Sequence, residues 1–148
     1  MQSIQEDQKV KVGVGVMVMK DGKVLLSQRI GSHGSSEFAF PGGHLEYGET
    51  FEGCAEREVA EECGDNFKIK NIRFLHLVNV VKRYAPKHYV HIGVAAEWAE
   101  GEPTRMEPEK QGEWGWYDPE NLPEPMFEMC RLAINILLRK TDGFYHTL

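Results

Sequence analysis

The sequence GGHLEYGETFEGCAEREVAEECG, residues 42–64, decides the fold because it places a strongly marked helix directly behind a glycine pair. Thr50 is a suitable N-cap, and Gly64 is a natural residue to follow the last turn. The segment therefore predicts a helix from about Phe51 to about Glu62. Acidic residues are concentrated on this helix, and their arrangement bears on function.

At about 100° per residue, Glu58, Glu61 and Glu62 share one face of the predicted helix. Glu58 and Glu62 are like charges four residues apart, which destabilises a helix by about 0.2–0.5 kcal/mol. One interpretation is a solvated acidic face, partly relieved by Arg57. The other is a site for a hard divalent cation, which binds carboxylate and phosphate oxygens together. The glycines at 42–43 favour the cation, because they let backbone approach a metal or a phosphate closely.

Before this segment the pattern is that of strands. Valine at every second position between Val10 and Met19 predicts a strand with one aliphatic face. An Asp-Gly turn at residues 20–23 and a returning strand at 24–29 complete a hairpin. A loop at residues 31–36 and a short extended piece at 37–40 then lead to the glycine pair.

After the helix, the sequence predicts a second hairpin, a polar loop and a closing helix. The ranges are strands at 71–83 and 88–98 with a turn at 84–87, a loop at 100–113, an aromatic run at 114–117, a turn at 118–123 and an amphipathic helix at 126–140. Two helices against such a sheet predict an α+β fold layered α/β/α, with a mixed sheet between helices. We expect residues 1–148 to form a single domain.

Composition narrows the function. The formal net charge is −6 with acidic and basic residues interspersed, so we expect no nucleic-acid polymer as a partner. No stretch is apolar enough to span a bilayer, and the opening residues do not resemble a secretory signal, so we expect no membrane and a cytoplasmic location. Cys54, Cys63 and Cys130 have no zinc-site spacing and are interpreted as buried thiols.

The segment resembles the signature of the Nudix family, which reads G-x5-E-x7-R-E-U-x-E-E-x-G-U, where U is a bulky aliphatic residue. The matching residues are Gly43, Glu49, Arg57, Glu58, Val59, Glu61, Glu62 and Gly64. Asp65 departs from the pattern where the last aliphatic residue is expected. We interpret this departure as a local packing change after the helix that leaves the carboxylates intact.

Further motifs, among them GVGVMVM, FAFPGGHLEYGE, HYV, MEPEK, GEWGWYD and ENLP, resemble the branch of Nudix nucleotide triphosphate diphosphatases that acts on modified and thiopurine nucleotides. The resemblance implies an α/β/α sandwich, commonly a homodimer. It also implies hydrolysis of a nucleoside triphosphate, such as an oxidised or modified purine deoxynucleotide, to monophosphate and pyrophosphate. Mg²⁺ or Mn²⁺ would be the cofactor.

The resemblance also implies roles for individual residues. Glu58 and Glu62 match the chief metal ligands, Glu61 is a further ligand or base, and Gly42 matches the position that gives a carbonyl to the metal. Glu109 of the MEPEK motif is an additional ligand or base candidate.

Two further roles concern orientation and proton transfer. Arg57 would orient the glutamates, and Glu49 would in turn hold Arg57 or the helix. Glu58 is our candidate for the carboxylate that accepts the proton of the attacking water.

The predicted substrate contacts come from outside the helix. They are Arg29, Phe40, Gly43, His44, His91, Trp114 and Trp116. Each has a structural alternative. The aromatic residues could be core, His91 an ordinary strand residue, Arg29 a surface ion-pair partner and His44 a structural hydrogen-bonding group.

Two other functions stay open. The first is hydrolysis of a different diphosphate, either a prenyl diphosphate or ADP-ribose. Against ADP-ribose, a proline often found beyond the signature in such hydrolases is replaced by Val80 and Val81. The second is a nucleotide-binding module without turnover, which the retained carboxylates argue against.

Overall fold

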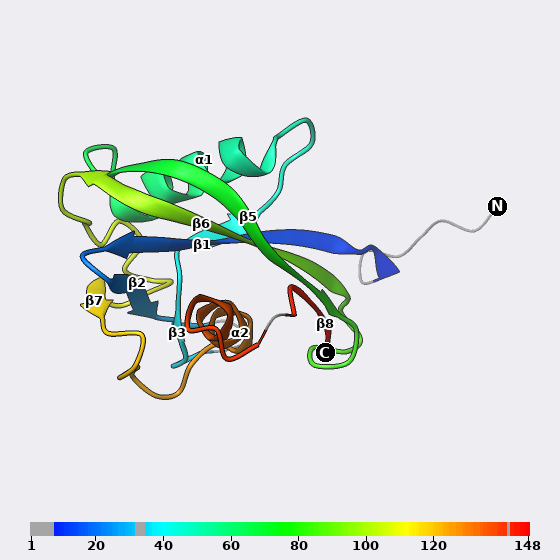
Figure 1. Cartoon of the computed structure of the whole chain (residues 1–148). Helices are drawn as coiled ribbons and strands as arrows, with labels where there is room; N and C mark the ends of the chain where they lie inside the picture. The colour runs from blue at the N-terminus through cyan, green and yellow to red at the C-terminus, as the bar shows by residue number, and fades with distance from the viewer. Residues whose placement is uncertain (1–7, 32–34, 142) are drawn as a thin grey trace.

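The computed structural model describes residues 8–31, 35–141 and 143–148, and the centre of the predicted loop at 31–36 lies outside these ranges. A curved sheet lies between helix α1 on one face and helix α2 on the other (Figure 1). The elements are β1 Lys11–Lys20, β2 Lys23–Gln28, β3 Phe38–Ala39, β4 Gly42–His44, α1 Phe51–Cys63, β5 Lys68–Val80, β6 Tyr89–Glu100, β7 Gly115–Tyr117, α2 Glu128–Leu137 and β8 Tyr145–Thr147. The predicted α+β sandwich is confirmed.

The sheet is mixed, with strand order β3-β2-β1-β6-β5-β8. Strand β1 pairs in parallel with β6 along one edge. Its other edge is shared, because residues 13–15 pair with β4 and residues 19–20 pair with β2. Strands β2 and β4 therefore pair with different parts of the same edge of β1. The cavity described below lies where they separate.

The two faces of β1 differ in a way that its sequence already contains. Val14, Val16 and Val18 pack with α1 in one apolar layer, as the alternating pattern predicts. On the opposite face, towards α2, Met17 belongs to the second layer. Gly13 and Gly15 precede it on that face and leave the sheet without side chains there.

Helix α1 has the predicted limits within one residue. The Thr50 side chain accepts a hydrogen bond from the Gly53 N–H at 2.9 Å, which caps the first turn. Gly64 follows the last turn with φ of 97°, a conformation that favours glycine. The helix buries Cys54, Ala55 and Val59 against the sheet, together with Glu58 and Cys63.

Three predictions about the fold need correction. The closing helix is shorter than residues 126–140, because Phe127 is its N-cap and Leu138 its C-cap. Strand β5 begins at Lys68 and ends at Val80, displaced from the predicted 71–83. Strands β4 and β8 were not predicted, since each has only three residues and is defined by pairing with a distant strand.

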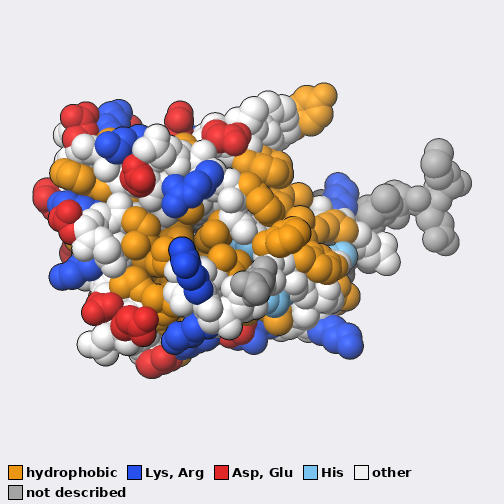
Figure 2. Space-filling view, viewed as in Figure 1, with side chains coloured by type: hydrophobic (Ala, Val, Ile, Leu, Met, Phe, Trp, Pro, Cys, Tyr) orange, Lys and Arg blue, Asp and Glu red, His pale blue; other side chains and the backbone are white. Residues whose placement is uncertain are grey.

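No helix among the described residues is long and apolar enough to span a bilayer. On the face drawn in Figure 2, acidic and basic side chains are interspersed rather than gathered into a field of one sign. All three cysteines are buried and free.

Candidate active site

A cavity of about 730 Å³ joins the carboxylates of α1 to the start of α2. Its acidic end is lined by Glu58, Glu61 and Glu62 of α1 together with Glu107 and Glu109 of the loop before β7. Between the two ends it is lined by Gly13 and Gly15 of β1. Its far end is lined by aromatic and apolar side chains, among them Phe40, Tyr84, Tyr89, Phe127 and Met129. One cavity thus offers a charged end and an aromatic end.

Arg57 connects the groups at the acidic end. Its Nε and Nη2 donate to the two carboxylate oxygens of Glu49 at 2.7 and 2.9 Å, a bidentate pair. Its Nη1 donates to Glu58 Oε1 at 2.7 Å and, more weakly, to Glu61 at 3.4 Å. Its Nη2 also donates to the His44 carbonyl at 2.9 Å. These hydrogen bonds lower the pKa of Glu49 to about 2 and raise that of Arg57.

The two glycines of β4 lie against the helix carboxylates. The Gly42 N–H donates to Glu62 Oε2 at 2.9 Å. A Cβ atom added at Gly43 would overlap the carboxyl group of Glu58, and one added at Gly42 would overlap the Val14 carbonyl. Glycine is therefore required at both positions by the close approach of α1 and β1.

Burial and mutual repulsion oppose ionisation of the helix carboxylates. Burial, together with the charges of Glu58 and Glu107, raises the pKa of Glu62 to about 8 against the hydrogen bond from Gly42. Burial likewise raises the pKa of Glu58, although Arg57 opposes the shift. The charge of Glu107 acts on both groups, and its side chain lines the same cavity. Such a cluster favours a cation that would neutralise it.

We expect the metal-free protein to lose stability as the pH rises from about 4.5 towards 8, because folded Glu62 holds its proton more tightly than the unfolded chain does. In this interval each pH unit removes at most about 1.4 kcal/mol of unfolding free energy. Urea unfolding in the presence of a chelator, from pH 5 to pH 8.5, measures the slope. Glu62→Gln should flatten it, and an equal slope in that variant would contradict the assignment.

The loop of residues 101–113 is fixed to the end of α1. The Glu62 carbonyl accepts from Gln111 Nε2 at 3.2 Å and from Trp114 Nε1 at 3.0 Å, with the Met106 N–H at 3.4 Å. The Thr104 N–H donates to the Cys63 carbonyl at 2.8 Å. Glu107 and Glu109 therefore lie on a loop anchored on both sides to the backbone of the helix.

The residues at the acidic end fit a hard divalent cation in their chemistry, since carboxylate oxygens are the ligands that Mg²⁺ and Mn²⁺ prefer. Among the described residues, no three histidine, cysteine, aspartate or glutamate side chains already converge as a metal site. Glu58 and Glu62 instead hold hydrogen bonds from Arg57 and Gly42. These residues therefore suit a divalent cation through their oxygen donor atoms and their negative charge.

Aromatic groups build the far end of the cavity. The Arg29 guanidinium lies 4.3 Å from the centre of the Phe127 ring. Tyr84 packs on both Phe127 and Tyr89, and the His44 ring stacks on Tyr89 at 6.1 Å. Burial and the charge of Lys11 lower the pKa of His44. This end suits a flat or apolar group.

Trp114 and Trp116, which the sequence predicts as substrate contacts, do not line the cavity. Trp114 instead donates to the Glu62 carbonyl. Trp116, on β7, packs against Phe67 in the α1 layer, with Lys20 over its ring at 5.7 Å. An indole supplies a large apolar surface and one donor. Trp114 uses its donor on the end of α1, whereas the buried Trp116 Nε1 has no hydrogen-bond partner among the described residues.

The other predicted site residues line this one cavity. They are Arg29, Phe40, Gly42, Gly43, His44, Arg57, Glu58, Glu61, Glu62, His91 and Glu109. Sequence reasoning missed Glu107 in the MEPEK motif, although a carboxylate two residues from Glu109 was a visible indication. It also missed Tyr84, Tyr89 and Phe127, which had been interpreted only as a turn, a strand and the start of a helix.

Comparison with known proteins defines the family. The family model of the NUDIX domain matches residues 9–133, so the chain belongs to the Nudix family. It is a Nudix hydrolase. It is 32% identical to the ADP-ribose pyrophosphatase of Methanocaldococcus jannaschii over 117 residues, which cover 79% of this chain and 67% of that protein.

Two further similarities agree. The chain is 29% identical to the 8-oxo-dGTP diphosphatase of Escherichia coli over 107 residues, which cover 72% of this chain and 79% of that protein. The crystal structure of a MutT NUDIX hydrolase from Burkholderia pseudomallei superposes with a TM-score of 0.79 at 28% identity, covering 86% of this chain and 97% of that one.

Proposed function

We propose that this Nudix hydrolase cleaves a nucleoside triphosphate, including oxidised or modified purine nucleotides, to the monophosphate and pyrophosphate. The observation that carries the proposal is the single cavity with carboxylates at one end and aromatic side chains at the other. Phosphates would lie at the acidic end with a cation, and the base at the aromatic end. The similarity to an 8-oxo-dGTP diphosphatase supports this choice.

The cation, Mg²⁺ or Mn²⁺, would be held by Glu58 and Glu62 with Glu61, the Gly42 carbonyl and a carboxylate of the anchored loop. It would supply charge neutralisation at the phosphate oxygens and a more acidic bound water. Glu107 joins Glu109 as a loop candidate, because its charge acts on Glu58 and Glu62.

The protein groups divide the remaining work. Arg57 holds Glu58 Oε1 at 2.7 Å, which leaves Glu58 Oε2 as the oxygen that accepts a proton from the attacking water. The raised pKa of Glu58 makes it a better base than an ordinary carboxylate. Glu49 keeps Arg57 in place through the bidentate pair. Arg29 and His44 are proposed to contact phosphate or sugar, and Phe40 to contact the base.

ADP-ribose hydrolysis is the second candidate. The 32% identity to an ADP-ribose pyrophosphatase favours it, and the same cavity would accept an adenine. A prenyl diphosphate is the third, since the far end is largely apolar. A nucleotide-binding role without turnover is set aside, because the family membership and the hydrolase relatives indicate an enzyme.

An activity assay of the purified protein with Mg²⁺ or Mn²⁺ tests the proposal. The substrates are dGTP, 8-oxo-dGTP, dCTP, ADP-ribose and geranyl diphosphate, and released pyrophosphate and phosphate are measured separately. We expect pyrophosphate from a nucleoside triphosphate as the leading activity. Turnover confined to ADP-ribose or to the prenyl diphosphate would replace the proposed substrate and keep the site.

Three broader expectations accompany this proposal. The whole chain is proposed to form one domain, to reside in the cytoplasm and to assemble as a homodimer. The first two rest on length and composition, and the last rests on family resemblance. A nucleic-acid polymer and a membrane are not among the proposed partners.

A further inference from the structure

Two glycines leave space over the sheet, beside the aromatic end of the cavity, because they have no side chains. Gly15 of β1 is paired with Gly93 of β6, which is paired in turn with His76 of β5. A Cβ at Gly15 would lie 2.9 Å from Cε1 of His91, and a Cβ at Gly93 would overlap the ring of His76. Each glycine therefore accommodates one imidazole that lies over the strand.

The two rings contact each other edge to face, with centroids 5.8 Å apart and an interplanar angle of 70°. His91 lines the cavity, and its ring makes no hydrogen bond to any described residue. His76 lies behind it with no exposed surface, and neither of its ring nitrogens has a hydrogen-bond partner in the described part of the chain. Together the rings form a layer that we term the imidazole floor, His76 and His91.

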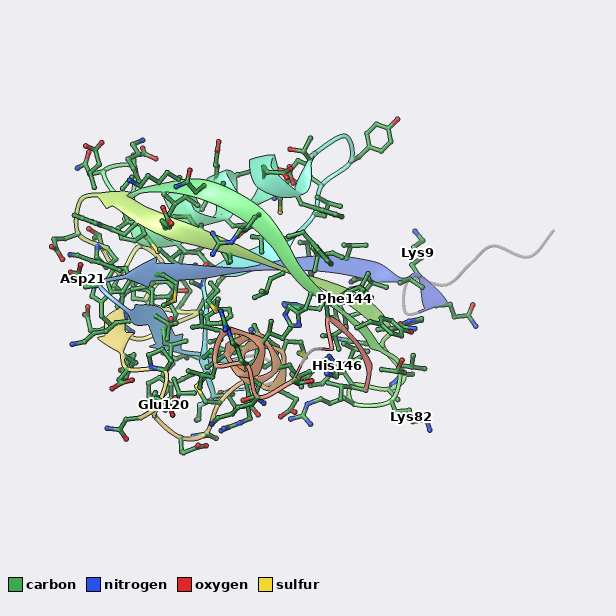
Figure 3. All side chains as sticks on the ribbon, in the orientation of Figure 1. Lys9, Asp21, Lys82, Glu120, Phe144 and His146 are labelled. Carbon is green, nitrogen blue, oxygen red and sulfur yellow. The ribbon has the colours of Figure 1, made fainter. Side chains whose placement is uncertain are left out.

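Both rings of the imidazole floor are neutral near pH 7. Burial, together with electrostatic interaction with His76 and Arg29 nearby, lowers the pKa of His91 to about 3. Burial, with His146 of β8 (Figure 3), lowers that of His76 to about 4. A neutral imidazole carries one donor and one acceptor. The floor thus presents hydrogen-bonding groups without charge.

Such a floor is not explained by packing. A buried polar group without a partner is unfavourable, whereas a phenyl or aliphatic side chain would fill the same space without that penalty. Two glycines in paired strands also weaken a sheet relative to other residues. A polar floor under an aromatic-walled cavity is what recognition of a flat group with a hydrogen-bonding edge requires.

We propose that His91 hydrogen-bonds the edge of a nitrogen heterocycle, the base of the substrate, and that His76 is a positioning residue which holds the His91 ring through the edge-to-face contact. The inference deepens the proposed function and rests on it for the identity of the base-bearing ligand. A prenyl chain has no such edge, so the imidazole floor selects nucleotides over prenyl diphosphates.

The test uses metal-free protein and calorimetric binding of AMP, GMP, CMP and UMP, with ribose 5-phosphate as the ligand that lacks a base. His91→Phe is expected to weaken binding of the preferred monophosphate about tenfold to a hundredfold and to leave ribose 5-phosphate unchanged. His88→Gln is the control, because His88 pairs with Asn79 at 2.6 Å and does not line the cavity. Equal binding by wild type and His91→Phe, or equal loss for both ligand types, overturns the proposal.

The role of His76 needs a readout that general damage would not reproduce. Gly93→Ala must displace the His76 ring, so it should weaken monophosphate binding several-fold in the wild type and have no effect in a His76→Ala background. With Mg²⁺, His76→Phe should raise KM for the nucleotide and leave kcat unchanged. Additive losses in the double variant, or a loss confined to kcat, overturn the positioning role.

A measurement on the wild type keeps the inference testable if a variant does not fold. In protein labelled with ¹⁵N-histidine, the ring nitrogens of His91 should shift with a nucleoside monophosphate and not with ribose 5-phosphate. A failure of the proposed function can be told apart from a failure of this inference. If only the proposed function is wrong, no triphosphate releases pyrophosphate, but the monophosphate still shifts the ring nitrogens of His91. Pyrophosphate release with an unshifted His91 would instead overturn only this inference.

Discussion

Glu62→Gln is expected to lower kcat/KM about 10³-fold while leaving the fold intact. The amide oxygen of glutamine can still accept the Gly42 N–H that now donates to Glu62 at 2.9 Å, so the packing of β4 on α1 is retained. Only the charge is lost. The electrostatic help of a bound cation is worth several kcal/mol, and about 1.4 kcal/mol corresponds to a factor of ten in rate.

The control for this variant is Glu56→Gln, an exposed glutamate of the same helix. It should retain wild-type kinetics and wild-type Mn²⁺ affinity, measured by electron paramagnetic resonance of free Mn²⁺. Removal of Glu62's charge should also stabilise the metal-free protein near pH 8, because repulsion from Glu58 and Glu107 is relieved. Full activity in Glu62→Gln would remove this residue from the proposed ligands.

Gly43→Ala is expected to reduce kcat by a factor of about 10² or more, although it adds only one methyl group. The added Cβ would occupy the position of the Glu58 carboxyl group, so that group has to move away from Arg57. Misplacement by about 1 Å of a group that must be aligned with the substrate is enough for a loss of this size.

Gly112→Ala is the matched control, because the nearest atom to an added Cβ there is 3.8 Å away. Both variants are compared by kcat, by Mn²⁺ affinity and by thermal unfolding. A Gly43→Ala protein with normal kcat would show that Glu58 need not occupy its present position. Equal losses in both variants would indicate a general effect of replacing glycine by alanine that does not depend on the Glu58 carboxyl group.

Local signals explain what the sequence could predict. Helix α1 has a capping threonine, a terminating glycine and a periodic apolar face, all within fifteen residues, and the structure places it within one residue of expectation. The alternating valines of β1 were equally reliable. The family signature then indicated where the carboxylates lie, because residues three and four apart fall on the same face of a helix.

Non-local features could not be predicted in the same way. Strands β4 and β8 are defined by partners about thirty and seventy residues away, respectively, and have little strand propensity of their own. The composition of the proline-containing loop does not indicate which of its carboxylates face those of α1. The sequence therefore predicts Glu109 and not Glu107, although both line the cavity. The sequence likewise does not indicate that Trp114 donates to the Glu62 carbonyl, because an indole N–H can bind a ligand or the end of a helix equally well.

The anchoring of residues 101–113 to the end of α1 has a consequence for how this enzyme can diversify. Because the Glu62 carbonyl holds the loop through Gln111 and Trp114, a substitution between these anchors and Thr104 changes the reach of Glu107 and Glu109 without altering the helix. The signature helix can therefore stay constant in evolution while substitutions in the loop change which substrates are bound. For a protein engineer, this loop is the place to begin a library, with the anchors kept fixed.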